Sequence, residues 1–248
     1  MNPAEYEKMH RLEQRYWWFV GRRRLVLRLI RRFGPFLPRN PVILDVGCGT
    51  GATAQELAEF GTVTAVDISE EALGFTLRRG VPRLVCANAQ NLPFADSSFD
   101  LVTALDVLEH LDNDCLGASE VRRVMKPGGL LIATVPALQV LWSRHDVALH
   151  HYRRYTRAQF RQLLTSCGLR VLKLSYCMTA LFPLVLAARM AERALPHRRE
   201  PSTTLPEVGG LLNWALTSLL EAEAETILRT NLPIGVSLVC VARKEEGQ

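Results

Sequence analysis

A glycine-rich turn directly after a short apolar segment constrains this chain more than any other feature. The segment Val42–Val46 has the length and β-branching of a buried strand, and glycines follow it at positions 47, 49 and 51. Such glycines let the backbone bend tightly and approach a ligand, because no Cβ stands in the way. A helix is expected from Ala52, so its first unpaired N–H groups would face the same place. This order predicts the ligand-binding edge of an α/β sheet.

An acidic residue at the end of the next predicted strand supports a ligand role for this turn. Asp67 lies near the end of an apolar stretch that begins at Thr62, 22 residues after Asp45. A carboxylate at this place can accept hydrogen bonds from both ribose hydroxyls of a nucleoside ligand. A purely structural glycine turn is the alternative, but it does not require this acid. The turn and the acid together therefore favour nucleotide binding.

The rest of the chain alternates between strand and helix patterns. Buried strands are predicted at residues 42–46, 62–68, 84–87, 99–105, 130–135, 169–176 and 234–242. Helices are predicted at residues 5–33, 52–60, 70–79, 114–125, 156–166, 178–195 and 211–229, and Thr156 and Gln159 predict a capping box. Strands that alternate with helices form right-handed crossovers, so we expect an α/β, doubly wound, Rossmann-like sheet of seven strands.

Breaks in these patterns divide the chain into four parts. Prolines and a glycine between residues 34 and 41 separate an N-terminal helical arm, residues 1–40, from a core at 41–176. A helical insertion at 177–232 precedes the last strand and tail at 233–248. The expected architecture is thus one core domain with an arm before it and an insertion near its end.

The positive charge of the chain is confined to the arm. The whole chain carries a formal net charge of +5, yet residues 1–40 hold ten basic and three acidic side chains, against 20 basic and 22 acidic in the remainder. A mildly acidic body disfavours a long nucleic-acid footprint, because it would repel phosphates. DNA is therefore not expected as a partner, while the arginine-rich arm leaves RNA open as an alternative substrate.

The glycine spacing points to one family of nucleotide-binding enzymes. The dinucleotide fingerprint is G-x-G-x-x-G, whereas this chain has G-x-G-x-G with Asp45 two residues before the first glycine. It resembles the class I S-adenosylmethionine-dependent methyltransferases, specifically a type 11-like branch with small-molecule or lipid-linked acceptors. Residues 88–100, 106–111 and 126–129 resemble the family's segments after strands three and four and before strand five. Asn88 departs from the family's usual Asp, although its carbonyl can accept the same adenine N–H.

The resemblance implies a cofactor and its position. The glycine loop and Asp106 would surround the methionine end, Asp67 would bind the ribose, and the residues near 68 and 89 would contact the adenine. The predicted cofactor-binding residues are Asp45, Gly47, Cys48, Gly49, Gly51, Asp67, Ile68, Asn88, Ala89, Asp106 and Val107. We expect S-adenosyl-L-methionine as cofactor, S-adenosyl-L-homocysteine as product and a last strand antiparallel to its neighbours. No metal is expected, since displacement from a sulfonium needs mainly alignment.

Acceptor chemistry is expected at the same edge of the sheet. His110 follows the fourth strand, and His151 and Tyr155 follow the fifth, so these three are the candidates for catalysis. The structural alternatives are a helix-start histidine and a solvated loop with a helix cap. The predicted substrate contacts are Trp18, Arg22, His145, His150 and Arg154.

The arm and the insertion carry apolar side chains next to arginines. We predict that Trp17, Trp18 and Phe19 form a half-buried lid with arginines facing solvent or substrate; a helix packed on the sheet without a ligand role is the alternative. For the insertion, with its linker at 196–210, the alternatives are core packing, an acceptor pocket, a homodimer interface or membrane contact. The arm or residues 178–199 would make that contact, and the flanking basic side chains that suit acidic headgroups are Arg189, Arg193, His197, Arg198 and Arg199.

These features together predict a methyltransferase. It would transfer a methyl group by in-line displacement to an O or N atom, less readily to C, of a small, hydrophobic or lipid-linked anionic acceptor. The alternatives are an RNA methyltransferase and a non-catalytic S-adenosylmethionine-binding module. No signal peptide opens the chain, so we expect a cytoplasmic protein, with a peripheral position at the inner membrane face left open.

Overall fold

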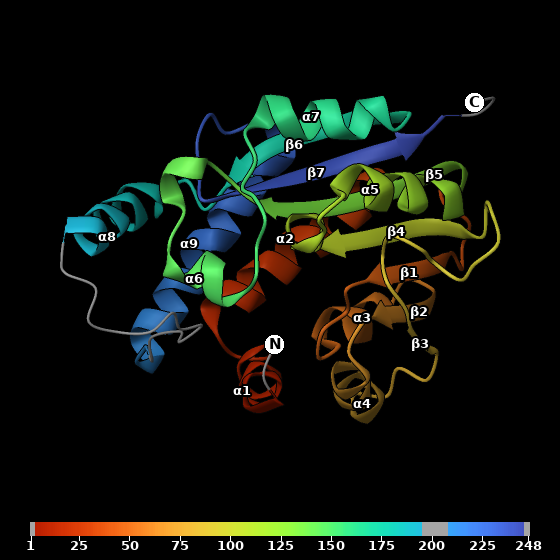
Figure 1. Cartoon of the computed structure of the whole chain (residues 1–248), viewed down its shortest axis with the longest axis horizontal. Coiled ribbons are helices and arrows are strands. Elements are labelled where there is room, and N and C mark those ends of the chain that lie inside the picture. The colour runs from red at the N-terminus through yellow and green to blue at the C-terminus, as the bar shows by residue number, and fades with distance from the viewer. Residues whose placement is uncertain (1–2, 195–207, 246–248) are drawn as a thin grey trace.

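The computed structural model describes residues 3–194 and 208–245, and its centre is a seven-stranded sheet (Figure 1). The strand order is β3-β2-β1-β4-β5-β7-β6, with β7 antiparallel to both of its neighbours. This confirms the predicted fold class, including the reversed last strand. The strands are β1 (Val42–Val46), β2 (Thr62–Asp67), β3 (Leu84–Cys86), β4 (Phe99–Leu105), β5 (Met125–Pro136), β6 (Leu169–Cys177) and β7 (Ser237–Lys244).

Helices cover both faces of the sheet. On one face α2, α3 and α9 pack with strand side chains such as Ile43 and Ile132, and on the other α5 and α7 pack with Leu131 and Val102. All seven residues of β4 are buried, as a central parallel strand between two helical layers requires. The helices are α1 (Pro3–Leu12), α2 (Trp17–Phe33), α3 (Ala52–Leu57), α4 (Glu70–Arg78), α5 (Asp114–Val124), α6 (Arg144–Ala148), α7 (Arg157–Ser166), α8 (Phe182–Ala194) and α9 (Gly210–Arg229), with 3₁₀ turns η1 (Leu108–His110) and η2 (Gln139–Leu141).

The arm is one of these layers and not a separate appendage. Val26, Leu29 and Ile30 of α2 are buried in the core of one sheet face, beside Ala224 and Ile227 of α9. Gly21 of α2 lies so close to α9 that an added Cβ would fall 2.5 Å from Leu220 Cδ1. The long helix α2 of the arm and the last helix, α9, therefore pack directly on each other.

Several predicted bounds differ from the structure. The single helix expected at residues 5–33 is broken between Leu12 and Trp17, giving α1 and α2. β5 already begins at Met125, before the predicted start at residue 130, whereas α8 and the last strand begin later than predicted, at Phe182 and Ser237. The capping box at Thr156 and Gln159 is confirmed at the start of α7. Residues 196–207 of the predicted linker lie outside the described residues. Across the described ranges, we find no helix with the length and hydropathy that crossing a bilayer would require.

Candidate active site

The glycine loop lies at the carboxyl edge of the sheet, between β1 and α3. Gly47 and Gly49 have φ values of +67° and +56°, a region that favours glycine. A Cβ on Gly47 would stand 2.5 Å from Val107 Cγ2, and one on Gly49 would stand 2.6 Å from the Met9 methyl group. The loop is therefore closely enclosed by the segment after β4 on one side and by α1 on the other.

Asp67 at the end of β2 ties this loop to the next helix. Its Oδ2 accepts a hydrogen bond from the Gly49 N–H at 2.9 Å, and its Oδ1 accepts one from the Ser69 N–H at 3.0 Å. Burial raises the pKa of the Asp67 carboxyl. Beside it, Ile68 is 71% exposed, an unusual position for a large aliphatic side chain at a concave sheet edge. Asn88 is exposed, with its Oδ1 accepting the Gln90 N–H.

Asp45 is buried beneath the loop. It is 2% exposed, and the Thr103 hydroxyl donates to its Oδ1 at 2.6 Å. Its Oδ2 has no hydrogen-bond partner among the described residues. Burial raises the pKa of Asp45 to about 7, with the Thr103 hydrogen bond opposing that rise. The carboxyl thus lies under the cofactor edge, with one oxygen left for a further donor or a nearby cation.

Asp106 connects the loop side of the site to the arm. It follows β4 with a φ of +57°, accepts a hydrogen bond from Thr134 at 2.9 Å and forms an ion pair with Arg22 of α2. The Arg22 guanidinium also lies over the Trp18 ring, 4.6 Å from its centroid. Trp18 and Arg22, predicted as substrate contacts, are thus placed next to Asp106.

A small cavity opens between the arm, the insertion and the ends of the central strands. It measures about 30 Å³, room for roughly two waters. Asp106 and Arg22 lie at its polar side, and α2 and α9 supply most of the apolar side. Its lining is Trp18, Gly21, Arg22, Leu25, Asp106, Thr134, Cys177, Met178, Leu220, Glu223, Ile227 and Ser237. An acceptor larger than a few atoms needs α2 or α9 to shift.

Two of the predicted catalytic side chains lie together near Asp106. The His110 and His151 rings are T-shaped at 4.6 Å between centroids. Burial, followed by the neighbouring His151, lowers the pKa of His110 to about 4, so its imidazole is neutral at neutral pH. His151 Nδ1 lies 3.0 Å from Asp146 Oδ1. Since Asp146 is an acceptor here, Nδ1 carries a proton, and Nε2 is the nitrogen that faces away from Asp146.

Asp146 organises the loop that carries His151. It is fully buried and accepts hydrogen bonds from Ser143, His151 and Arg154. Burial alone would raise the pKa of Asp146, but the hydrogen bond from His151 and the Arg154 charge hold it well below its usual range. Arg154 also donates to the Ala137 carbonyl at 3.1 Å. Arg154, predicted to touch substrate, is thus engaged inside the loop.

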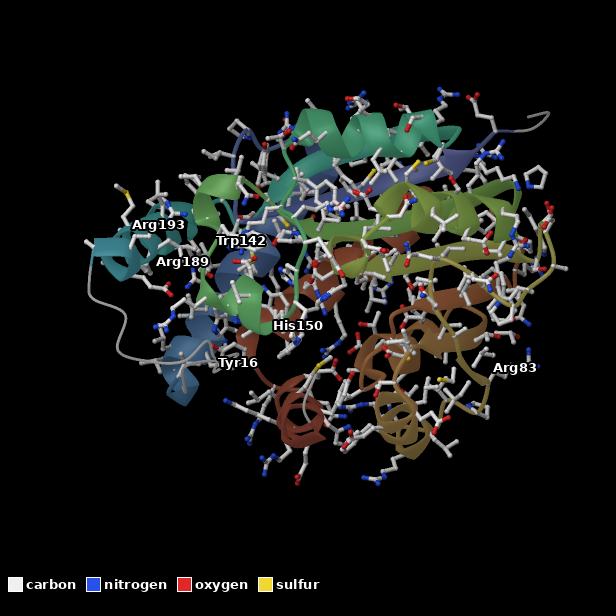
Figure 2. All side chains as sticks on the ribbon, in the orientation of Figure 1. Tyr16, Arg83, Trp142, His150, Arg189 and Arg193 are labelled. Atoms are coloured by element: carbon white, nitrogen blue, oxygen red, sulfur yellow. The ribbon has the colours of Figure 1, made fainter. Side chains whose placement is uncertain are left out.

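The other predicted acceptor-site residues lie apart from the His110–His151 pair or are already bonded. Tyr155 is 4% exposed and donates to Asp114 Oδ2 at 2.7 Å, so its hydroxyl points toward α5. Burial, and then the hydrogen bond to Asp114, raises its pKa above the ordinary tyrosine range. His145 is half-buried with a pKa lowered by burial. His150 is exposed beside α6, as Figure 2 shows.

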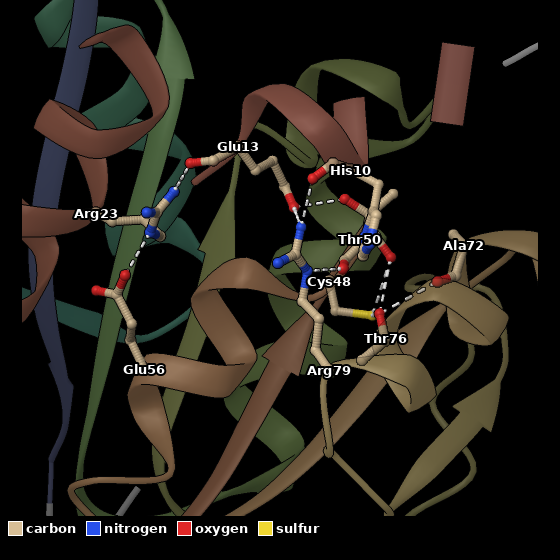
Figure 3. A network of polar contacts seen from close by, with 10 residues as sticks. His10, Glu13, Arg23, Cys48, Thr50, Glu56, Ala72, Thr76 and Arg79 are labelled. Atoms are coloured by element: carbon tan, nitrogen blue, oxygen red, sulfur yellow. Dashed lines mark hydrogen bonds and ion pairs between the residues drawn. The ribbon is translucent and has the colours of Figure 1, made fainter. Parts of the chain in front are cut away.

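A network that sequence reasoning missed fastens the arm to the glycine loop (Figure 3). Glu13, in the break between α1 and α2, is 4% exposed and accepts a hydrogen bond from the Thr50 hydroxyl. Arg79 donates to the Thr50 carbonyl and the His10 carbonyl, each at 2.7 Å, and pairs with Glu13. Arg23 donates to the Glu13 carbonyl and to Glu56. Glu13 is flanked by polar residues such as Arg11, Gln14 and Arg15, so no local sequence pattern indicated this role.

The arginines of α2 are paired with acids of this chain. Arg22 pairs with Asp106, Arg24 with Glu221 and Arg28 with Glu225. The expectation that they face solvent or substrate is wrong for Arg23, which is 5% exposed. Trp17 and Trp18 are half-buried, as predicted, and Phe19 is buried. Two acids of α9, Glu221 and Glu225, thus pair with two of the arm's arginines.

The sheet order with a reversed seventh strand, the glycine loop after β1 and the acid after β2 define the class I S-adenosylmethionine-dependent methyltransferases. Residues 44–133 match the family model described as a methyltransferase domain. These residues therefore match a methyltransferase domain, and the whole sheet has the strand order of this class.

Similar proteins support this assignment. The chain is 42% identical over 112 residues to a demethylmenaquinone methyltransferase of Corynebacterium urealyticum, covering 45% of this chain and 48% of that protein. It is 31% identical over 134 residues to a 2-methyl-6-phytyl-1,4-hydroquinone methyltransferase of a Synechocystis species, covering 52% and 40%. The chain spans about half or less of the length of these curated relatives. A solved Haemonchus contortus phosphoethanolamine N-methyltransferase 2, in complex with S-adenosyl-L-methionine, shares the fold at a TM-score of 0.59 and 23% identity, over 89% of this chain and 52% of that one.

Proposed function

We propose that this protein binds S-adenosyl-L-methionine along the glycine loop and transfers its methyl group to a small acceptor held between α2 and α9. The observation that carries the proposal is the position of Asp106. It follows the strand that neighbours the glycine loop, and it also lines the cavity between the two helices. A cofactor on one side and an acceptor on the other would meet at this residue, as in-line displacement demands.

The cofactor pose follows from the described contacts. The Asp67 carboxylate would exchange its hydrogen bond with the Gly49 N–H for two ribose hydroxyls. Exposed Ile68 would lie against the adenine, and the unpartnered oxygen of Asp45 would lie near the positive methionine end. Cys48, Val107 and Ala89 would line the path between these ends, and Asn88 would meet the adenine amine. Met9 would close the site from above the loop.

The acceptor proposal rests on the lining of the cavity. Apolar side chains of α2 and α9 suit a hydrophobic acceptor, and the two curated relatives are named for quinol-type compounds, one with a phytyl chain. We propose an acceptor hydroxyl or amine on a ring or headgroup with an apolar tail. An anionic group on the acceptor would have to separate Arg22 from Asp106, because that guanidinium is already paired. Cavity opening and the breaking of this pair would then occur together.

The proton of the acceptor would leave toward the two histidines. His151 is the better base, because its Nε2 keeps a lone pair while Asp146 orients the ring. His110, with its pKa near 4, would be a weaker base that shapes the pocket. Tyr155 would act as a positioning residue through Asp114 and the loop.

Exposed apolar side chains on α8 and α9 carry the proposal that a lipid-linked acceptor is met at a membrane surface. Leu184, Met190, Leu211 and Trp214 are between 60% and 81% exposed. In Figure 2, Arg189 and Arg193 lie near Trp142, and Arg193 donates to the Trp142 carbonyl at 3.1 Å. The positions of His197, Arg198 and Arg199 lie outside the described residues. A homodimer through the same face is the alternative, and cytoplasmic location remains part of the proposal.

Transfer of tritium-labelled methyl groups would test the proposed function. A panel of prenylated hydroquinones, unprenylated catechols, small amines and bulk RNA is incubated with the protein and labelled cofactor. The proposal predicts label on a small acceptor and none on RNA. Label on RNA alone would support the nucleic-acid alternative, and cofactor binding without transfer to any of them would support a non-catalytic module.

A further inference from the structure

The segment after β4 holds a fully buried carboxylate without a partner. Glu109 is 0% exposed, and neither side-chain oxygen has a hydrogen-bond partner among the described residues. Burying such a group is unfavourable unless a proton or a cation satisfies it. Something other than the described side chains is therefore needed to accompany the ionised form.

Two imidazoles face this carboxylate. One ligand atom from each of Glu109, His110 and His151 lies within 4.8 Å of the others. Around a bound transition metal such atoms are about 3 to 3.5 Å apart, so side-chain movements of about 1 Å close the set. The backbone already fixes their relation, because the Tyr152 N–H donates to the Glu109 carbonyl at 2.8 Å.

The surroundings orient His151 as metal sites orient their histidines. Its Nδ1 donates a hydrogen bond to the buried carboxylate of Asp146, which leaves Nε2 as the nitrogen available to the cluster. A carboxylate behind a ligating histidine is a common arrangement at protein metal sites, since it sets the tautomer and the ring direction.

We propose that Glu109, His110 and His151 bind one divalent transition-metal ion beside the acceptor cavity, contrary to the expectation of a metal-free site. Two imidazoles and one carboxylate suit Zn²⁺, Fe²⁺, Co²⁺ or Mn²⁺ better than Mg²⁺ or Ca²⁺, and they leave coordination positions open. Metal binding rests on the geometry alone. The role at those open positions rests on the proposed function: they bind the acceptor hydroxyl.

In that role the metal assists O-methylation. It favours the deprotonated hydroxyl, whose proton then passes to water and not to His151, because a metal-bound Nε2 has no lone pair to accept it. The oxygen then forms a bond to the methyl carbon while the carbon–sulfur bond breaks, and its electron pair remains on sulfur as S-adenosyl-L-homocysteine. The overall change is sulfonium cofactor plus hydroxyl to methyl ether, thioether and one proton, so no further reactant is needed.

Cobalt titration of the full-length protein after EDTA dialysis tests the site. We expect one equivalent of Co²⁺ to bind, with visible ligand-field absorption, and Zn²⁺ to displace it. Glu109→Gln and His151→Gln should each weaken Co²⁺ binding at least about 100-fold, and Asp146→Asn about 10- to 100-fold through the lost orientation of His151. Asp112→Asn, which alters an exposed carboxylate nearby, should bind like the parent.

Thermal melting checks that every variant is folded, and Co²⁺ should raise the melting temperature of the parent but not of Glu109→Gln. Parent protein without cobalt absorption or a metal-dependent melting shift would overturn the proposal, as would equal Co²⁺ affinity in the parent and in folded Glu109→Gln. Methyl transfer measured in parallel separates the two claims. Cobalt binding without any transfer would leave the metal site standing and remove the proposed function, and transfer unaffected by EDTA would remove only the metal's role.

Discussion

At the residue scale, the two carboxyl groups near the glycine loop differ in their surroundings. Asp67 lies at the sheet edge, where it accepts hydrogen bonds from backbone N–H groups, whereas Asp45 is buried and accepts one from the Thr103 hydroxyl. The positions of both were predictable, because the glycine motif and the strand pattern are local in sequence. The contact between Glu13 and Arg79 was not predictable. The two residues are 66 positions apart along the chain, and only the fold brings them together.

The raised pKa of Asp45 predicts a pH dependence of stability. Burial raises the pKa of Asp45 in the folded protein from its ordinary value of 3.8 to about 7, so the fold favours the protonated form. The contribution of Asp45 to the free energy of unfolding is fully present below about pH 4 and is lost as the pH rises through 7. We expect this to remove about 2 to 4 kcal/mol of unfolding free energy between pH 4 and 8.

Urea denaturation of the parent and of Asp45→Asn across this pH range measures that contribution. The neutral amide can still accept the Thr103 hydroxyl, so the difference in unfolding free energy between the two proteins should change steadily with pH. Parallel curves from pH 4 to 8 would show that the Asp45 pKa is not raised in the fold.

At the element scale, the strands of the core were predictable to within a few residues and the arm was not. Apolar runs bounded by glycine and proline mark the central strands β1 and β4, which are buried on both faces. The break between α1 and α2 has no proline or glycine, and its cause is Glu13, which turns inward to Thr50 and Arg79. The packing of α2 on α9 likewise depends on the contact between Gly21 and Leu220. This contact joins residues far apart in the sequence, so no local pattern predicts it.

Removing the guanidinium from the network between the arm and the loop should be strongly destabilising. Arg79→Met leaves Glu13 buried without its cation, which typically lowers the unfolding free energy by about 3 to 5 kcal/mol. The matched control is Arg78→Met at the neighbouring exposed position, expected to change it by less than about 1 kcal/mol. Urea denaturation gives both values.

The double variant Glu13→Gln/Arg79→Met sharpens this test. With the acid neutralised, the loss should be smaller than in Arg79→Met alone, because no charge is left buried without a partner. A double variant less stable than the single one, or Arg79→Met as stable as Arg78→Met, would contradict the role of the network.

At the scale of the whole molecule, the arm and the insertion, which are far apart in the sequence, line one cavity where we propose that the acceptor binds. The arm contributes Trp18 and Arg22, and the insertion contributes Leu220 and Glu223. Of the alternatives for the insertion, core packing is observed for part of α9, and an acceptor pocket between α2 and α9 is our proposal. The positive arm, which first suggested a nucleic-acid partner, is matched by acids on α9 and at Asp106.

Enlarging the cavity should change acceptor preference. Leu220→Ala removes a 6% exposed side chain between α2 and α9, so it should lower the unfolding free energy by about 2 to 4 kcal/mol. It should also raise kcat/KM for bulky relative to small hydroquinones by about 3- to 10-fold. Leu219→Ala, at a position 38% exposed, is the control and should leave that ratio unchanged. An unchanged ratio in Leu220→Ala would place the acceptor elsewhere.

The central claim is that S-adenosyl-L-methionine binds at the edge formed by the glycine loop and Asp67, and calorimetric titration tests it most directly. The cofactor is titrated into the parent, Asp67→Ala and the control Asp96→Ala, whose carboxylate is exposed and pairs with Arg123 on the opposite end of the sheet. We predict one site in the parent and in Asp96→Ala, and affinity at least about 10-fold weaker in Asp67→Ala, because two hydrogen bonds to a charged group are lost. No binding to the parent, or equal affinity in all three proteins, would contradict the account.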